Sequence, residues 1–228
     1  MQARDRGKLF RFLAGSKIVL LFLPDYSLLL FLAVLYRSRI PLRRHLFLDG
    51  GGHDGSSVRR FRKEFDPQMR FRIVTFEPNP VYAQAYADMP KHQLIEAALS
   101  DHDGAASLYL DREDGDGSTL FRNKLTRDNG GFGVLDIENP IQVRTVNLSR
   151  WLRQHTSVLD YIILKLDVEG AEYAILEKLL RDGLLRRVAH LFIEWHWSRV
   201  AVPEQTHRAL LDRIARHVPV LEWDAQGF

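Results

Sequence analysis

The chain has 228 residues, of which 46% are hydrophobic, so it can bury a full core and does not have the composition of a disordered chain. It contains no cysteine, which excludes a disulfide framework, a thiolate zinc site and a cysteine nucleophile, and which is compatible with a reducing compartment. The net charge is +3, but residues 1–45 carry nine Lys and Arg residues against two acids, so the remainder is mildly acidic. An acidic domain without a basic stripe argues against a nucleic-acid partner.

Residues 1–44 are predicted to form a helical extension that is both apolar and basic. Ile18–Tyr36 approaches the length needed to cross a bilayer, but Pro24 and Asp25 interrupt it, and a carboxylate at mid-membrane is costly. Three arrangements stay open: a cap packed on the main domain, a hairpin on an anionic membrane surface, and a true span. A secretory signal peptide is disfavoured because no small-residue cleavage site follows. We therefore expect a cytoplasmic protein, with any membrane contact at the cytoplasmic face.

Residues 45–228 are predicted to form one domain in which strands alternate with helices. This order predicts an α/β fold with a doubly wound, mostly parallel sheet and right-handed crossovers. Ligands bind at the carboxyl ends of the strands in such sheets, so the loops that follow strands are the places to search. The predicted strands are 45–50, 71–80 (closed by its two prolines), 92–100, 106–110, 161–167, 188–197 and 218–223, and the predicted helices are 56–65, 81–89, 168–183 and 203–217.

A glycine-rich loop, "FLDGGGHDGSS", joins the first strand to a helix that its two serines are expected to cap. Gly51 and Gly55 suit a turn with positive φ and the close approach of a ligand to the backbone. The helix amides beyond Gly55 favour an anionic or carboxylate group. Glu77 ends the second strand, 22 residues after Gly55, where an acid accepts hydrogen bonds from both hydroxyls of a ribose. The combination predicts a cofactor that contains ribose.

Asp49 distinguishes between the possible cofactors. A carboxylate directly beside a pyrophosphate is repelled, which counts against an NAD(P)-binding oxidoreductase, although the glycine loop allows one. Asp49 can instead receive the ammonium group of S-adenosylmethionine, directly or through water. S-adenosylmethionine is therefore the predicted cofactor.

Six motifs, between about His45 and Trp197, together resemble the FkbM-type methyltransferase family: "FLDGGGHDGSS", "FEPNP", "EAALSDHDG", "VNLSRWL", "LKLDVEGAEYAIL" and "FIEWH". The resemblance implies a Rossmann-like class I fold, S-adenosylmethionine as cofactor, and O-methylation, often of sugars, glycans or secondary metabolites. It assigns the glycine loop to the cofactor, Glu77 to its ribose, and Leu99 with Ser100 to its adenine side. In the family, a small apolar residue usually stands at Gly52 and Asn at His53. The predicted cofactor contacts are Asp49, Gly51, Gly52, His53, Gly55, Glu77, Pro78, Leu99, Ser100 and Asp167.

Acidic and basic side chains lie at the end of the predicted strand 161–167 and just after it, in the motif "KLDVEGAE". Lys165, Asp167 and Glu169 alternate and so share one side if the strand continues. Methyl transfer to a hydroxyl needs an aligned acceptor and a base that takes its proton. Asp167 is the first candidate for the base or for an acceptor-orienting group, and Glu169 is the second. In the alternative interpretation, Asp167 only caps the following helix.

Glu194 and His196 lie at the end of the next strand and are expected to face the same cleft. His196 has the intrinsic pKa of a proton-transfer group, and Glu194 could orient it; both are candidate catalytic residues, with a structural role as the alternative. A metal site from His53, Asp167, Glu194 and His196 lacks a close-spaced ligand pair, so no metal is predicted.

The polar stretch 111–140 is too long for an ordinary connection. It is predicted either to fold over the acceptor, with Ser118 and Thr119 in the matching family region, or to form a surface insertion.

Only "DAQGF" follows the last strand, so the seventh strand of class I methyltransferases is missing or replaced by the N-terminal helices. An exposed sheet edge would permit a homodimer. A catalytically silent binding module stays open as a second alternative to an enzyme.

Overall fold

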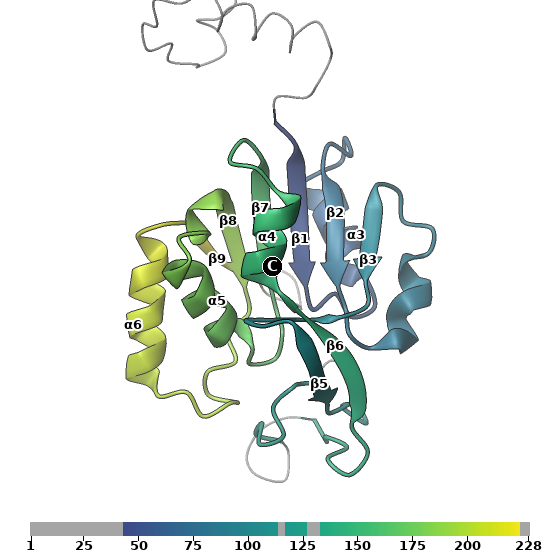
Figure 1. Cartoon of the computed structure of the whole chain (residues 1–228). Helices are drawn as coiled ribbons and strands as arrows, with labels where there is room; N and C mark the ends of the chain where they lie inside the picture. The colour runs from purple at the N-terminus through teal and green to yellow at the C-terminus, as the bar shows by residue number, and fades with distance from the viewer. Residues whose placement is uncertain (1–42, 114–116, 127–132, 224–228) are drawn as a thin grey trace, which may run out of the picture. The chain divides into compact units, whose positions relative to one another are not determined.

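The computed structural model describes residues 43–113, 117–126 and 133–223 (Figure 1). The predictions for the N-terminal extension fall on residues outside these ranges, apart from Arg43 and Arg44. Within the described ranges, none of the helices combines the length and the apolar character needed to cross a bilayer.

The main sheet has six parallel strands within the described residues, in the order β3-β2-β1-β7-β8-β9. The strand order reverses between β1 and β7, because the chain builds outward from β1 to β3 and then crosses back to β7. This topology confirms the predicted doubly wound α/β fold. The strands are β1 His45–Gly50, β2 Arg72–Phe76, β3 His92–Ile95, β7 Tyr161–Leu166, β8 Val188–Ile193 and β9 Val220–Glu222.

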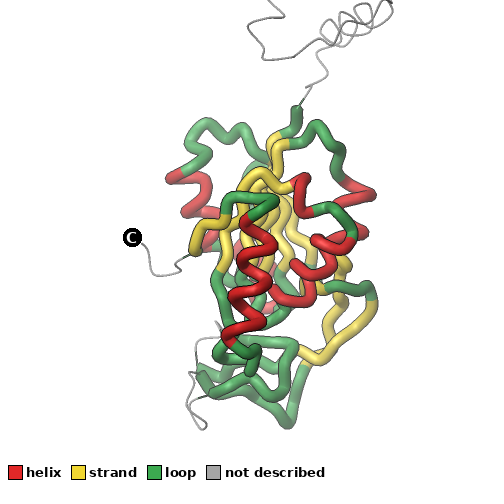
Figure 2. Tube along the Cα trace, turned by 90° about the vertical axis from the view of Figure 1, so that its left-hand side faces the viewer, coloured by secondary structure: helices red, strands yellow, loops and turns green. Residues whose placement is uncertain are grey.

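Helices cover both faces of this sheet (Figure 2). On one face, α3 (Ser56–Glu64) stacks Phe61 on Phe47 of β1, with ring centroids 3.9 Å apart. On the other face, α4 (Leu148–His155), α5 (Glu172–Arg181) and α6 (Glu204–Ala215) pack on the alternate residues of the same strands, such as Leu48 and Leu164. Burial on both faces explains why the strands are continuous apolar runs in the sequence.

A smaller sheet, in the order β4-β6-β5, stands beside the carboxyl end of the main one (Figure 1). The single strand predicted at 92–100 is wrong: it is β3 in the main sheet and β4 (Ala98–Ser100) in the small one. The chain bends between them, where the amide of Ala97 donates to the carbonyl of Ile95. β5 (Gly104–Leu108) runs antiparallel to β6 (Ile141–Asn147). β5 overlaps the strand predicted at 106–110, whereas β6 was not predicted.

The predicted helices exist, but two of them begin or wind differently. Residues Pro80–Tyr86 form a 3-10 helix, η1, that is capped by the side chain of Asn79, and a second short one, η3, covers Leu185–Arg187. α5 begins at Glu172 rather than at 168, and it ends as predicted before Gly183, whose φ is +67°.

Candidate active site

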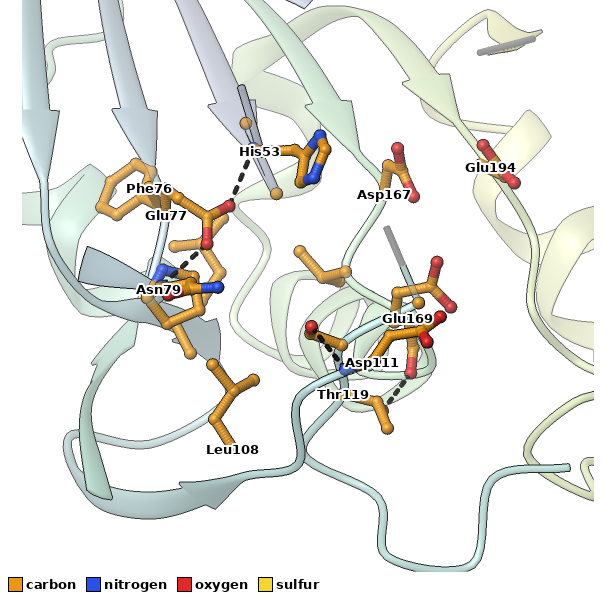
Figure 3. A pocket seen from close by; sticks show the side chains of 18 of the residues that line it. His53, Phe76, Glu77, Asn79, Leu108, Asp111, Thr119, Asp167, Glu169 and Glu194 are labelled. Atoms are coloured by element: carbon orange, nitrogen blue, oxygen red, sulfur yellow. Dashed lines mark hydrogen bonds between the residues drawn. The ribbon is translucent and has the colours of Figure 1, made fainter. Parts of the chain in front are cut away.

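A cavity of about 660 Å³ opens where the strand order of the main sheet reverses. Figure 3 shows Glu77 on one side of it, and Asp167 and Glu194 on the other, at the ends of neighbouring strands. Parallel sheets place their ligand sites at this position, and the volume lies in the range of roughly 300–1,000 Å³ that is typical of small-ligand pockets. Gly51, Gly52, His53, Pro78, Leu99 and Glu169 also line it.

The glycine loop touches the loop that follows β7. Gly51 has φ +75°, and a Cβ atom there would lie 1.8 Å from the carbonyl oxygen of Asp167. Glycine is therefore required by the contact between two backbones, besides any need of a ligand. Gly55 has φ +82° and is itself the N-cap of α3, so the predicted capping by serines is wrong. Ser57 points to Asp49 instead.

Asp49 is fully buried beneath the glycine loop. Its Oδ2 accepts hydrogen bonds from the hydroxyls of Ser57 at 2.7 Å and Thr75 at 3.2 Å, and its Oδ1 lies 3.4 Å from the ammonium of Lys165. The carboxylate thus ties α3, β2 and β7 to the end of β1. Its predicted contact with a cofactor stays a prediction, and its burial disfavours the direct form of that contact.

Glu77 is held in a fixed orientation at the edge of the cavity (Figure 3). Its Oε2 accepts a hydrogen bond from the amide of His53, and its Oε1 accepts one from the amide of Asn79, both at 2.8 Å. Burial raises the pKa of this carboxyl, and the two amide donors oppose that rise. Each oxygen keeps lone pairs for a further donor, which is what binding a ribose diol requires.

An apolar wall lies next to Glu77. Phe76, Ala98, Leu99 and Leu108 contribute to it from β2, β4 and β5. Such a surface suits the flat face of an aromatic base. Ser100, the predicted neighbour of Leu99 in this role, lies 93% buried, and its hydroxyl contacts the side chains of Asp101 and His102.

Lys165 joins the two sides of the cavity. Its ammonium donates to the carbonyl of Gly51 at 2.6 Å and lies 3.2 Å from Oδ2 of Asp167. Burial raises the pKa of Asp167 to about 6, although the charge of Lys165 opposes the rise. Asp167 is therefore a carboxylate whose proton affinity lies close to neutrality, as suits a general base.

The alternative interpretation, that Asp167 caps the next helix, is wrong. α5 begins five residues later, at Glu172, and within the described residues no side chain caps it. Glu172 plays the comparable part: its carboxylate accepts hydrogen bonds from the amides of Val168 and Gly170 and fixes the turn. Glu169 has φ +53° in this turn and lies at the cavity wall.

His196 lies just outside the cavity wall, with no exposed surface, whereas Glu194 lines the cavity. Burial lowers the pKa of His196, but the neighbouring carboxylates of Glu169, Glu172 and Glu194 outweigh burial and raise that pKa to about 12. Burial likewise opposes ionisation of Glu169, yet His196 and Lys124 lower its pKa to about 2. The expectation that Glu194 and His196 both face the cleft holds for Glu194 alone.

The described parts of the stretch 111–140 lie across the cavity. Thr119 donates from its hydroxyl to the carbonyl of Glu169 at 2.7 Å (Figure 3), and Lys124 forms an ion pair with the Glu169 carboxylate. The amide of Leu125 donates to the carbonyl of Arg199. These contacts attach the segment to the loops after β7 and β8, while its predicted place over an acceptor stays a prediction.

Four residues that shape the site were not predicted as site residues, and their signals in the sequence differ. Lys165 interrupts an apolar strand, and Glu172 and Asn79 belong to the motifs "DVEGAE" and "EPNP", so attention to each charge or amide in these motifs would have found them. Lys124 carries no such signal, because its partner Glu169 lies 45 residues away in the chain.

The parallel sheet and the cavity at its switch point define a Rossmann-like protein. A model of the methyltransferase FkbM domain matches residues 49–218, so the chain belongs to the FkbM methyltransferase family, which confirms the resemblance drawn from the motifs. A solved structure of a methyltransferase FkbM from Methylobacillus flagellatus KT aligns with a TM-score of 0.43 at 12% identity; the alignment covers 79% of this chain and 40% of that one. A comparison with curated proteins finds no match.

Proposed function

We propose that the chain transfers a methyl group from S-adenosylmethionine to a hydroxyl oxygen of a sugar, a glycan or a secondary metabolite. Membership of a methyltransferase family supports methyl transfer and disfavours the NAD(P)-dependent oxidoreductase and the catalytically silent module. The observation that carries the proposal is the Glu77 carboxylate, which two backbone amides hold in the same cavity as the glycine loop and Asp167.

Each side of the cavity then has its own part in the reaction. Glu77 receives the ribose hydroxyls, the apolar wall receives the adenine, and the loop 51–53 lies along the methionine portion. The acceptor oxygen attacks the methyl carbon, the carbon–sulfur bond breaks, and S-adenosylhomocysteine remains. Asp167 takes the hydroxyl proton or orients the acceptor, and Glu169, Glu194 and His196 set the charge around it.

Cofactor binding is tested by calorimetry with S-adenosylhomocysteine and with NAD. We expect heat from S-adenosylhomocysteine alone, and at least about tenfold weaker binding by Glu77→Gln, because a hydrogen bond to a charged group contributes about 1.5–3 kcal/mol. Glu96→Gln, at an exposed position, is the matched control and should bind like the wild type. No heat from S-adenosylhomocysteine on folded protein, or heat from NAD only, would refute the proposal.

The part of Asp167 is tested by turnover. The wild type and Asp167→Asn are incubated with methyl-labelled cofactor and with fractionated glycan, lipid-linked sugar and small-molecule extracts. We expect label in one fraction, and a loss of about 10²-fold or more in the variant, the usual contribution of a general base, with cofactor affinity retained. Undiminished turnover by Asp167→Asn would remove this residue from the mechanism.

We also propose a cytoplasmic location, with residues 1–44 lying on an anionic membrane surface, and assembly as a homodimer. The basic and apolar composition of 1–44 supports the first, and the edge position of β9 in the described sheet supports the second. Flotation of the full chain with phosphatidylserine vesicles tests the membrane contact, and recovery in the bottom fraction would contradict it. Sedimentation equilibrium tests the homodimer, and a monomer mass would contradict it.

A further inference from the structure

The imidazole of His196 is fully buried, and its two nitrogens have different surroundings. Nδ1 lies 2.9 Å from Oε1 of Glu172, whereas Nε2 has no hydrogen-bond partner among the described residues. Nε2 faces three carboxylates: Glu169 at 3.4 Å, Glu194 at 3.5 Å and Asp167 at 3.9 Å. A buried nitrogen of this kind in a native structure needs an explanation, such as an ion between it and the oxygens.

Glu172 fixes the direction in which His196 points. It is itself fully buried, and its two oxygens accept hydrogen bonds from the amides of Val168 and Gly170. In the neutral imidazole that a metal ion would bind, Nδ1–H donates to this carboxylate, and Nε2 carries the lone pair and is directed into the cluster. Histidines that bind metal ions are oriented by a carboxylate in this manner.

The separations within the cluster fit those of ligands around one cation. Asp167, Glu169 and His196 each offer one ligand atom, and these atoms lie within 4.8 Å of one another. Two ligands about 2.1 Å from a metal ion are about 3.4 Å apart at a tetrahedral angle. The distances of 3.4 Å and 3.5 Å from Nε2 to Glu169 and Glu194 match that spacing.

We propose that His196, Glu169 and Asp167, with Glu194 as a fourth donor, bind a divalent transition-metal cation. One imidazole nitrogen among carboxylate oxygens suits Mn²⁺, Fe²⁺ or Zn²⁺ better than Mg²⁺ or Ca²⁺, which prefer oxygen throughout. The expectation of no metal relied on spacing along the chain, and the adjacent ends of β7 and β8 bring together residues that the sequence separates. This binding requires neither cofactor nor acceptor, so it goes beyond the proposed function.

Three cationic side chains border the cluster. Lys124 and Arg199 lie near Oε2 of Glu169, and Lys165 lies near Oδ2 of Asp167. An ionised carboxylate has about four lone-pair sites, so Glu169 can pair with Lys124 and still bind a metal ion. Oδ1 is the oxygen of Asp167 that faces Nε2. The competing arrangement is an imidazolium that balances the carboxylates without any metal.

The test is a titration of the full chain, freed of metal and without cofactor, with Mn²⁺, in which free Mn²⁺ is measured by electron paramagnetic resonance. We expect saturable binding of one Mn²⁺ per chain, with Zn²⁺ as a competitor. Glu194→Gln and His196→Gln should each weaken binding at least tenfold, and Glu172→Gln should weaken it by 10- to 100-fold through the lost orientation of His196.

Two controls separate metal binding from folding. His217→Gln, at an exposed position, should bind Mn²⁺ like the wild type. Glu194 is partly exposed, so circular dichroism should show a folded Glu194→Gln variant even if His196→Gln does not fold. The proposal is overturned if the wild type shows no saturable binding of Mn²⁺ or Zn²⁺, or if a folded Glu194→Gln variant binds as tightly as the wild type. Because the titration contains no cofactor, neither outcome bears on S-adenosylmethionine binding.

Discussion

The two sides of the cavity are built by different means. On the side of the glycine loop and Glu77, backbone conformation and hydrogen bonds from backbone amides fix the surface: Gly51 fits against the Asp167 carbonyl, and two amides hold Glu77. On the opposite side, Asp167, Glu169, Glu194 and His196 crowd together, and Nε2 of His196 lacks a hydrogen bond among the described residues. The first side is therefore held mainly by the backbone, while the second concentrates charged side chains.

Lys165 connects the two sides, so its replacement should have the largest effect on folding. In Lys165→Met, Asp49 stays buried without its counter-ion, and breaking a buried pair in this way costs about 3–5 kcal/mol. Urea unfolding measures the loss. Lys63→Met, at an exposed position, should change the free energy of unfolding by less than about 0.5 kcal/mol. A Lys165→Met variant as stable as the wild type would show that the two sides are not coupled through this ammonium.

The loop side depends on contact between backbones, which Gly51→Ala tests. A left-handed conformation costs an alanine about 1–2 kcal/mol, and overlap with the Asp167 carbonyl adds about 1–3 kcal/mol of the kind seen in overpacked cores. Gly183→Ala is the matched control, since Gly183 also has positive φ but an added Cβ meets nothing within 4 Å. We expect thermal unfolding to show the larger loss for Gly51→Ala; equal losses would mean that the close contact contributes nothing.

The smallest effect on stability is expected for a substitution outside the cavity, at Asp182. The dependence of this effect on pH provides the test. Hydrogen bonds from Ser149 and Lys178 lower the pKa of Asp182 to about 2, from 3.8 in the absence of interactions. Because the folded pKa is depressed, this stabilisation is complete above pH 3.8 and is lost as the pH falls toward 2. Asp182→Asn should therefore cost less than about 1 kcal/mol at pH 7, the usual value of a surface pair, and progressively less as the pH falls through 2. A difference that is independent of pH would contradict the assignment.

The sequence predicted the main sheet well, because its strands are buried on both faces and therefore read as uninterrupted apolar runs. It failed at Ile95–Ala98, where an apolar run continues through a bend that moves the chain into a second sheet. It also failed for β6, which follows the long polar stretch and mixes exposed with buried residues.

Like the sheet, the site could be predicted from the sequence only in part. Residues at strand ends, such as Glu77, Asp167 and Glu194, were found because parallel strands deliver their carboxyl ends to one edge. The position of Glu169 beside His196, and the pairing of Lys124 with Glu169, were not predictable, because they depend on how the turn after β7 and the segment 111–140 fold in three dimensions.

The contact between Gly51 and the carbonyl of Asp167 limits how the cavity can be redesigned. Widening the glycine loop to enlarge the cavity would displace the backbone that carries Asp167. Trimming Leu108, which lines the cavity from the small sheet, would enlarge the cavity and leave both loops of the main sheet in register.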